Sequence, residues 1–136
     1  MTHTRENCIF CDIISGKAAA HIIKQNENVI VFLSLEGHPL VVPKAHIPDV
    51  FSLDPENAGH VMREAVAISN ALREVCKCDG INLIQSNGSA AGQDVFHFHL
   101  HIKPRWKDDD VIIRWNTDAE EEQKRLELGR RLRAQL

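Results

Sequence analysis

Residues 95–103 read Val-Phe-His-Phe-His-Leu-His-Ile-Lys, so apolar side chains alternate with histidines. Successive side chains of a β-strand point to opposite faces, and this period of two predicts a strand over residues 95–103. The apolar side chains, beginning with Phe96, are expected to face the core. His97, His99 and His101 then lie on the opposite face. A strand face that needs only solubility would carry Lys, Thr or Glu, so we interpret the three histidines as a functional group.

The histidine row suits two kinds of chemistry. Neutral imidazole is the commonest metal ligand, and imidazole also serves as nucleophile, acid and hydrogen-bond donor in phosphate chemistry. The preceding loop favours the second use. Residues 88–92, Gly-Ser-Ala-Ala-Gly, are small and can expose several backbone N–H groups, which hold phosphate oxygens. Because the loop runs directly into the strand, a bound phosphate would lie across the imidazoles.

The first half of the chain predicts a short helix, three strands and a long helix. The short helix covers residues 8–15 and ends at Gly16. Strands are expected at residues 21–24, 28–33 and 40–43. The long helix begins at Asp54, which suits the N-cap, with Pro55 in the first helical position. Its apolar stripe recurs at steps of four and three, at Val61, Ala65, Ile68, Leu72 and Val75.

After the long helix, a strand is expected at residues 81–85, followed by the histidine strand. A last helix is predicted over residues 118–135, where Thr117 and Glu120 would form a capping box. Its apolar face is thin and consists of Leu128, Leu132 and Leu136. The order α-β-β-β-α-β-β-α predicts a single α+β domain over residues 1–136. Its antiparallel meander sheet would carry one long helix, a short N-terminal helix and a C-terminal helix.

Composition excludes several classes of protein. The chain has 136 residues, with 16 basic and 19 acidic side chains and a formal charge of −3. This lack of a basic excess argues against a nucleic-acid-binding protein. The apolar stretches are too short to span a membrane, and the polar N-terminus does not resemble a signal peptide. We therefore expect a cytoplasmic protein without nucleic-acid or membrane partners.

The cysteines are not expected to form disulfides in a reducing compartment. Cys8 and Cys11 have the Cys-x-x-Cys spacing of half a zinc site. The spacing alone fits equally well two small buried residues on an early helix, so the residues leave both readings open.

Three blocks of the sequence together resemble the histidine-triad (HIT) family. Residues 92–102, Gly-Gln-Asp-Val-Phe-His-Phe-His-Leu-His-Ile, resemble its signature, in which Gly-Gln precedes three histidines spaced by single apolar residues. Residues 37–47 resemble its second block, and residues 7–14 its N-terminal block. The resemblance covers residues 8–105, is closest to the bacterial Hit proteins of the Hint-like branch, and leaves the helical tail at residues 117–135 without a motif.

The resemblance implies a nucleotide hydrolase that acts at the α-phosphorus of a nucleoside phosphoramidate or related purine nucleotide. By position, His99 would be the nucleophile and form a nucleotidyl-histidine intermediate that water resolves. His101 would donate to the phosphate oxygens and help to protonate the leaving group, and Gln93 would position that group. The family also implies a homodimer, whose sheets join into one. The implied nucleotide-binding residues are Ile9, Phe10, Ile13, Phe32, Leu33, Ser34, Ser86, Gly92, Asp94 and Val95.

A structural zinc ion is the second implication of the resemblance. Its ligands would be Cys8, Cys11, His46 and His97, a set that suits a closed tetrahedral site. In this interpretation His97 braces the strand, and the chemistry itself requires no metal. The other histidines, which are His3, His21, His38 and His60, are assigned no functional role.

Three positions depart from the family pattern and bear on the substrate. The family usually has a ribose-binding Asp after its Phe-Leu pair, whereas this chain has Ser34-Leu35-Glu36. Ser86 replaces a usual Asn, and Asp94 replaces a usual Ser or Thr beside the leaving group. The Asp94 carboxylate would repel a phosphate-rich leaving group, so phosphoramidates are favoured over dinucleoside polyphosphates.

Three alternative functions stay open. The chain could be a zinc-stabilised nucleotide-binding or adaptor protein with little turnover, or a dinucleoside polyphosphate hydrolase. It could also be a metal hydrolase that uses the histidines as catalytic ligands, although enzymes of that kind need more chain and more distant ligands.

Overall fold

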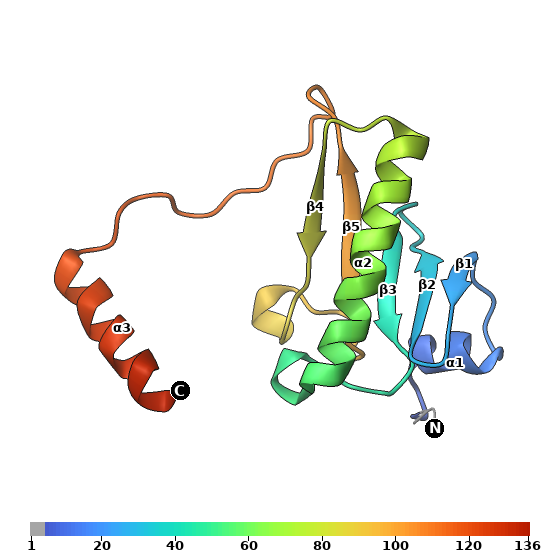
Figure 1. Cartoon of the computed structure of the whole chain (residues 1–136), viewed down its shortest axis with the longest axis horizontal. Helices are drawn as coiled ribbons and strands as arrows, with labels where there is room; N and C mark the ends of the chain where they lie inside the picture. Colours follow the sequence, from blue (N-terminus) through green and yellow to red (C-terminus); the bar gives the residue numbers. More distant parts are fainter. Residues whose placement is uncertain (1–4) are drawn as a thin grey trace.

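A five-stranded antiparallel sheet organises the chain, and the computed structural model describes it within residues 5–136 (Figure 1). The first four residues, which include His3, lie outside the described part. The sheet order is β1-β2-β3-β5-β4, so the last strand in the sequence inserts between its two neighbours. This arrangement confirms the antiparallel α+β fold expected from the sequence. The strands are β1 (Ile22–Gln25), β2 (Val29–Leu33), β3 (Pro39–Pro43), β4 (Gly80–Ile84) and β5 (Leu100–Arg105).

The long helix α2 (Pro55–Cys76) packs across one face of the sheet. Its start is as predicted, because the Asp54 side chain accepts a hydrogen bond from the Asn57 N–H. Val61, Ala65 and Ile68 are buried as expected. Val75 was wrongly assigned to this stripe: it lies in the last turn, beyond the buried part of the helix, and is 81% exposed. The core on this side comprises Val29, Val31, Val41, Val61, Ala65, Ile68, Phe98, Leu100 and Ile102.

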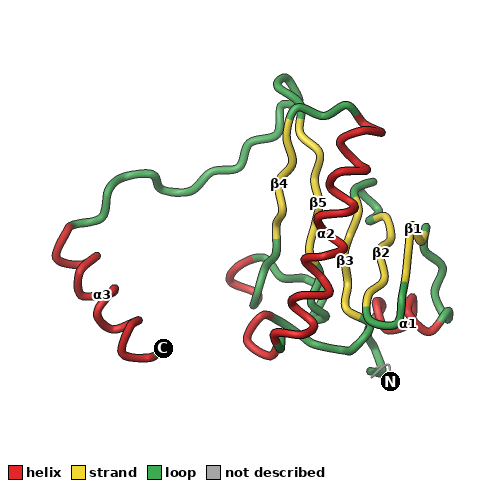
Figure 2. The backbone as a smooth tube through the Cα atoms, viewed as in Figure 1, coloured by secondary structure: helices red, strands yellow, loops and turns green. Residues whose placement is uncertain are grey.

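The short helix α1 (Ile9–Ser15) packs on the opposite side of the sheet. Gly16 ends it with a φ of 83°, a left-handed conformation that glycine adopts without strain. The second core cluster joins α1 to β2 and β3 through Cys8, Phe10, Cys11, Ile13, Ile30, Phe32, Leu40 and Val42. Figure 2 shows α1 near β1 and β2 rather than near β4. On this face His101 and Lys103 of β5 therefore keep partial exposure.

The histidine strand is shorter than the alternation predicts, because β5 begins at Leu100 rather than at Val95. Phe96 was wrongly placed in the core and is 49% exposed, whereas His97 is fully buried. The reason lies in the neighbouring strand. Pro43 ends β3 and has no N–H for a ladder, so the chain before Leu100 leaves the regular pairing. The Phe98 N–H instead donates to the Ile47 carbonyl, with an N···O distance of 2.6 Å.

The C-terminal helix α3 (Glu122–Gln135) begins four residues later than predicted. The expected capping box of Thr117 and Glu120 is wrong, because Glu121 is the N-cap and its side chain makes no capping hydrogen bond. The Asp118 N–H donates to the Asn116 side chain at 2.9 Å, which forms a local turn in place of a first helical turn. Within residues 5–136, no helix combines the length and the apolar character needed to cross a membrane.

Candidate functional site

The three histidines do not form one uniform row. His97 points to a cluster of cysteine and histidine side chains, where its Nδ1 lies 3.5 Å from the Cys8 Sγ. His99 and His101 stay together, with ring centroids 4.9 Å apart. The irregular backbone at residues 95–99 produces this separation. His97 therefore lies apart from the other two histidines, and its separate role stays a prediction.

The ring of His99 is held by the backbone of its neighbour. Its Nδ1 lies 2.7 Å from the His97 carbonyl oxygen, and a carbonyl can only accept a hydrogen bond. Nδ1 therefore carries a proton, and in the neutral ring the lone pair is on Nε2. The ring is 6% exposed and meets the Phe10 ring edge-on at a centroid distance of 5.0 Å. A fixed ring with this tautomer is the arrangement that an imidazole nucleophile requires.

A hydrogen-bonded chain orients His101. The His38 Nε2 lies 2.8 Å from the His101 Nδ1, and the Ser34 Oγ lies 3.2 Å from the His38 Nδ1. The Ser34 Oγ also accepts from the His38 backbone N–H at 3.3 Å, so its hydroxyl hydrogen is free to donate to Nδ1. His38 can then donate from Nε2 to His101. This leaves the proton of His101 on Nε2, the ring nitrogen that takes no part in these hydrogen bonds.

His38 is the residue that the sequence analysis missed. It lies two residues before Leu40, which pairs with His101 across β3 and β5, so the two histidines share a face of the sheet. The signal was therefore the register between two distant strands. The sequence alone did not supply that register.

Burial keeps His101 and His38 neutral near pH 7. It lowers the pKa of His101 to about 4, and the charges of His99, His38 and Lys103 act in the same direction. Burial also lowers the pKa of His38, again with a contribution from Lys103. Glu36 opposes both shifts and forms an ion pair with Lys103 at 3.6 Å. The neutral state agrees with the hydrogen-bond chain, in which each ring both donates and accepts.

Gln93 holds the small-residue loop in place. Its Oε1 accepts from the Gly88 N–H at 2.7 Å, and its Nε2 donates to the Pro48 and Val95 carbonyls at 2.7 and 3.1 Å. Both ends of this buried amide are therefore used within the protein. A direct contact with a leaving group stays a prediction.

The other loop residues lie around the same turn. Gly92 ends a short 3-10 helix, Ser89–Ala91, with a φ of 89°. The Asp94 carboxylate accepts from the Val95 N–H at 2.9 Å and remains exposed. Ser86 follows Ile84, which pairs with His101, so the loop begins beside the histidines.

The expected purine-binding group is only partly brought together. Phe10, Ile13 and Phe32 are buried in the second core cluster, and the rings of Phe10 and Phe32 meet edge-on at 5.4 Å. Ile9 is 49% exposed and Leu33 is 37% exposed. The Phe10 ring also contacts the His99 ring, so this apolar group adjoins the histidine pair.

Cys8, Cys11, His46 and His97 meet as the sequence predicts, with one ligand atom from each within 4.8 Å of the others. The Cys11 Sγ lies 3.3 Å from the His46 Nδ1 and 3.6 Å from the His97 Nδ1. A tetrahedral zinc with bonds of about 2.3 Å to sulfur and about 2.0 Å to nitrogen has sulfur-to-nitrogen edges of about 3.5 Å. The spacing of these atoms therefore fits the ion.

The surroundings of the cluster also suit a metal. The His97 Nε2 lies 2.7 Å from the Pro43 carbonyl, which fixes the proton there and leaves Nδ1 free to ligate. The Cys11 Sγ accepts from the Arg5 backbone N–H at 3.2 Å, and the Cys8 Sγ accepts from the Cys11 N–H at 3.4 Å. Burial raises the pKa of the Cys11 thiol, an effect that a bound cation would oppose.

Comparison with known proteins identifies the fold and its motifs. Residues 15–108 match the HIT domain. The chain belongs to the HIT family. "Protein hit" of Bacillus subtilis is 39% identical over 124 residues, which cover 88% of this chain and 86% of that protein. Adenylylsulfatase HINT3 of Arabidopsis thaliana is 33% identical over 85% of this chain, which spans 59% of that longer protein.

Three solved structures of bacterial proteins are similar to this HIT protein over most of its length. A HIT family protein from Bacillus anthracis has a TM-score of 0.88 and 34% identity, covering 98% of this chain and 99% of that chain. SMU.412c from Streptococcus mutans has a TM-score of 0.91 and 31% identity, over 99% and 88%. A zinc-bound histidine triad family protein from Mycobacterium smegmatis has a TM-score of 0.74 and 38% identity, over 94% and 91%.

The free energy of unfolding of this HIT protein is expected to fall as the pH drops from about 6.5 to 4 in the presence of a chelator. Burial lowers the pKa of His97, like that of His101, to about 4. In this interval the unfolded chain binds more protons than the folded chain, so acid favours unfolding. His97 alone accounts for about 3 kcal/mol. Urea unfolding at several pH values measures the slope; His101→Gln should make it shallower, and a flat profile would contradict the prediction.

Proposed function

We propose that this HIT protein hydrolyses a nucleoside phosphoramidate, or a related purine nucleotide, at the α-phosphorus through a nucleotidyl-histidine intermediate. The observation that carries the proposal is the geometry of His99, whose Nδ1 donates to the His97 carbonyl at 2.7 Å. This contact leaves Nε2 as a neutral nucleophile next to a second oriented imidazole. Adenylylsulfatase HINT3, a relative named for a reaction of an adenylyl group, supports the same class of chemistry.

The proposed reaction has two steps. The His99 Nε2 attacks the α-phosphorus and the phosphorus–nitrogen bond to the leaving amine breaks. The amine takes a proton from solvent, while the Nε2–H of the neutral His101 donates a hydrogen bond to the departing group. Water then attacks the phosphorus of the nucleotidyl-histidine and releases a nucleoside monophosphate. The attacking water gives a proton to solvent, and His99 recovers its lone pair. No metal takes part in either step.

The leaving group is inferred from the exposed Asp94 in the loop that precedes the histidines. A carboxylate there disfavours an anionic leaving group and tolerates an amine. The ribose contact would involve Glu36, since the Ser34 hydroxyl is already used by His38. Glu36 is held near His101 by its ion pair with Lys103. The purine would lie against the side chains around Phe10 and Phe32.

We infer that Cys8, Cys11, His46 and His97 hold a structural zinc ion. The tetrahedral spacing and the fixed tautomer of His97 support this assignment, as does the zinc-bound relative from Mycobacterium smegmatis. The ion would supply a cross-link between α1, the segment after β3 and the segment before β5. It would thereby fix the backbone that carries the His97 carbonyl.

We further propose a homodimer in which two sheets join along β4. This strand lies at the edge of the sheet, so one row of its backbone groups has no partner strand within residues 5–136. Leu83 of this strand is 45% exposed. A second copy that pairs with this edge would satisfy the free backbone groups.

Mass spectrometry of the reacting protein tests the proposed chemistry. The chain is mixed with adenosine phosphoramidate and chelator, quenched with base within seconds, and digested. We expect a nucleotidyl adduct on His99 together with release of adenosine monophosphate. A dinucleoside polyphosphate is the comparison substrate and should react more slowly. Nucleotide binding by calorimetry without adduct or product would overturn the hydrolase and favour the binding or adaptor alternative.

His38 is expected to act as a positioning residue for His101. His38→Ala should lower kcat by roughly 10- to 100-fold with a smaller change in KM, because His101 loses the donor that fixes its tautomer. Ser34→Ala should show a weaker effect in the same direction. The pH profile of kcat should shift in both variants, since the pKa of His101 depends on its neighbours. An unchanged kcat and pH profile in His38→Ala would contradict this role.

A further inference from the structure

A short turn between β2 and β3 lies beside the histidine pair. The Gly37 N–H donates to the Ser34 carbonyl at 2.9 Å, and the Ser34 N–H donates to the His38 carbonyl at 2.8 Å. Gly37 closes the turn with a φ of 93°, a left-handed conformation that glycine adopts without strain. The other two residues of the turn are Leu35 and Glu36, and both are exposed.

Lys103 reaches this turn from β5. It follows His101 by two residues, so both side chains lie on the same face of the sheet. Its Nζ lies 3.6 Å from the Glu36 carboxylate. The charge of Lys103 lowers the pKa of both His38 and His101, and because Coulomb interactions weaken with distance, the ammonium lies near both rings. A cation therefore stands beside two neutral imidazoles.

The partner of this ammonium is loosely held. The side chain of Glu36 is 74% exposed and that of Lys103 is 33% exposed. An ion pair in such contact with water contributes little, so a second anion can join or displace the carboxylate. Arg105, the next cation on this face, is instead held by Asp109 and by the Asn82 side chain, each at 2.7 Å. Lys103 is thus free to take a further anionic partner, whereas Arg105 is not.

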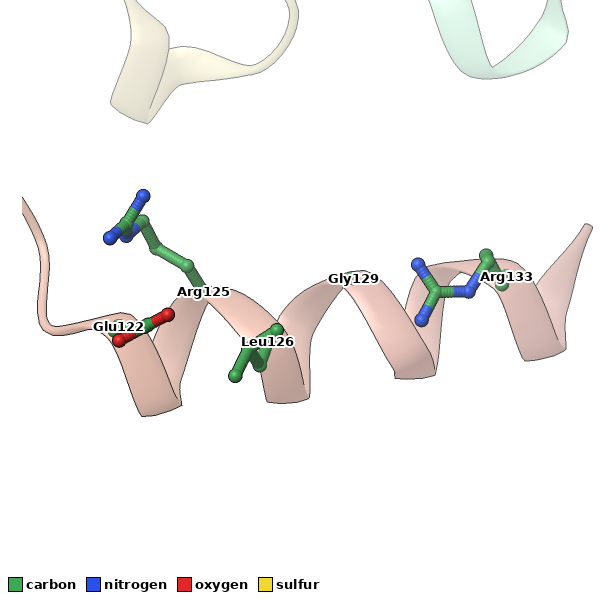
Figure 3. A pocket seen from close by; sticks show the side chains of 5 residues that line it. All are labelled: Glu122, Arg125, Leu126, Gly129 and Arg133. Carbon is green, nitrogen blue, oxygen red and sulfur yellow. The ribbon is translucent and has the colours of Figure 1, made fainter.

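The arginines of the C-terminal helix stand elsewhere. Figure 3 shows Arg125 and Arg133 on α3, on either side of Gly129. Figure 1 shows α3 apart from the sheet, beyond the β4 edge, whereas Lys103 belongs to β5 inside the sheet. Within residues 5–136, these arginines therefore do not accompany Lys103 at the histidine pair.

The proposed nucleotide brings its ribose to the same place. The purine is proposed to lie against Phe10 and Phe32, and the α-phosphorus is proposed to meet the His99 Nε2. The ribose joins these two groups, so it lies between them. Ser34, the first residue of the turn, follows Phe32 by only two residues. The ribose hydroxyls therefore meet the turn and the Lys103 ammonium.

A carboxylate and an ammonium recognise ribose in different ways. A carboxylate accepts hydrogen bonds from unmodified ribose hydroxyls, whereas a cation at this place accommodates a phosphate on one of them, as dinucleotide-binding sites illustrate. A phosphate monoester carries about −1.5 to −2 charges near neutral pH. The ion pair offers both groups, because the Lys103 ammonium can donate to a phosphate while the Glu36 carboxylate accepts from the remaining hydroxyl. An unmodified ribose uses the carboxylate alone.

We propose that Lys103 binds a phosphate on the 2′ or 3′ oxygen of the ribose, so that the preferred substrate is a purine nucleotide phosphorylated on its sugar. The inference rests on the proposed function, which places the nucleotide, and it names the substrate class of the same site. The ribose phosphate forms charge-assisted hydrogen bonds and no covalent bond. Lys103 is therefore a specificity-determining residue, and the reaction at the α-phosphorus keeps the steps given above.

Calorimetric titration of the full chain with four nucleotides tests the proposal. One of adenosine 3′,5′-bisphosphate and adenosine 2′,5′-bisphosphate should bind at least about 10-fold more tightly than adenosine 5′-monophosphate, because charge-assisted hydrogen bonds are added. Comparing the two bisphosphates assigns the 2′ or the 3′ position. Adenosine 5′-diphosphate is the matched ligand, since it carries its additional phosphate on the 5′ side, and it should gain no comparable affinity. Equal affinity for the monophosphate and both bisphosphates would overturn the proposal.

Two substitutions in the ion pair should have opposite effects. Lys103→Met keeps the length of the side chain and removes its charge, so the affinity ratio of the preferred bisphosphate to the monophosphate should fall below about 2. Glu36→Gln removes the competing carboxylate, so the same ratio should rise above its wild-type value. Both variants lose the ion pair, so a merely structural role would not move the ratio in opposite directions. The matched control is Lys77→Met, which removes an ion pair with Glu74 at the end of α2 and should keep the wild-type ratio.

Each other outcome also has a defined meaning. If Lys103→Met weakens the bisphosphate and the monophosphate by the same factor, the ammonium contacts the α-phosphate and the ribose-phosphate site is overturned. Tighter binding of the diphosphate than of either bisphosphate overturns it as well. The His99 adduct with adenosine phosphoramidate is measured separately. An adduct without a preference for a bisphosphate overturns this inference alone, and a preference without an adduct overturns the hydrolase and leaves the ribose-phosphate site.

Discussion

Replacing His99 by alanine is expected to lower kcat/KM for adenosine phosphoramidate by at least about 10⁴-fold, because the reaction loses its nucleophile. Only hydrolysis by oriented water would remain. The substitution should also abolish the mass-spectrometric adduct. Since the ring is buried between Phe10 and His101, the variant leaves a cavity, and its folding must be measured with its activity.

Two controls make the His99 result decisive. Urea unfolding and zinc content should show that His99→Ala keeps its fold and its metal site. His21 is exposed and precedes β1, the edge strand at the opposite end of the sheet from β4, so His21→Ala should keep full activity. Added imidazole should restore part of the activity of His99→Gly by filling the vacant position. A His99→Ala variant with wild-type turnover would refute the proposed mechanism.

Loss of the zinc site is expected to have the largest effect on stability. Cys11→Ser should remove zinc and lower the free energy of unfolding by about 3–5 kcal/mol, because Cys11 is 1% exposed and the ion joins segments that are distant in sequence. A chelator should have a similar effect on the wild type. Zinc content after dialysis, together with urea unfolding, measures both changes.

The matched control for the zinc site is Cys76→Ser, at the far end of α2, which should keep zinc and most of the stability. The folded Cys11→Ser protein should keep most of its activity although its free energy of unfolding is lower, since the metal takes no part in the proposed steps. Two results together would contradict the metal site. Wild-type protein from cells grown with zinc would contain no zinc after purification, and chelator would leave its free energy of unfolding unchanged.

Local sequence signals predicted most of the fold. Asp54 and Pro55 located the start of α2, and Gly16 located the end of α1, because caps and backbone conformation depend on adjacent residues. The predicted burial of Phe96 was wrong because a period-two pattern describes only a regular strand. β3 ends at Pro43, so the segment before Leu100 has no regular pairing there, and this depends on a contact between distant segments.

The candidate site was predictable in its parts rather than in its connections. The resemblance to the HIT family named Cys8, Cys11, His46 and His97, which the structure brings together at the metal cluster. His38 was missed because its role depends on the register of β3 against β5.

The hydrogen bond from His99 to the His97 carbonyl has a consequence for how this site tolerates change. The acceptor belongs to the main chain, and every residue type at position 97 would present it. The metal cluster uses the imidazole of the same residue. Substitutions can therefore dismantle the metal cluster without deleting the acceptor that sets the tautomer of the nucleophile. The two roles of one residue are separable by mutation, because a substitution at position 97 removes the imidazole and keeps the carbonyl.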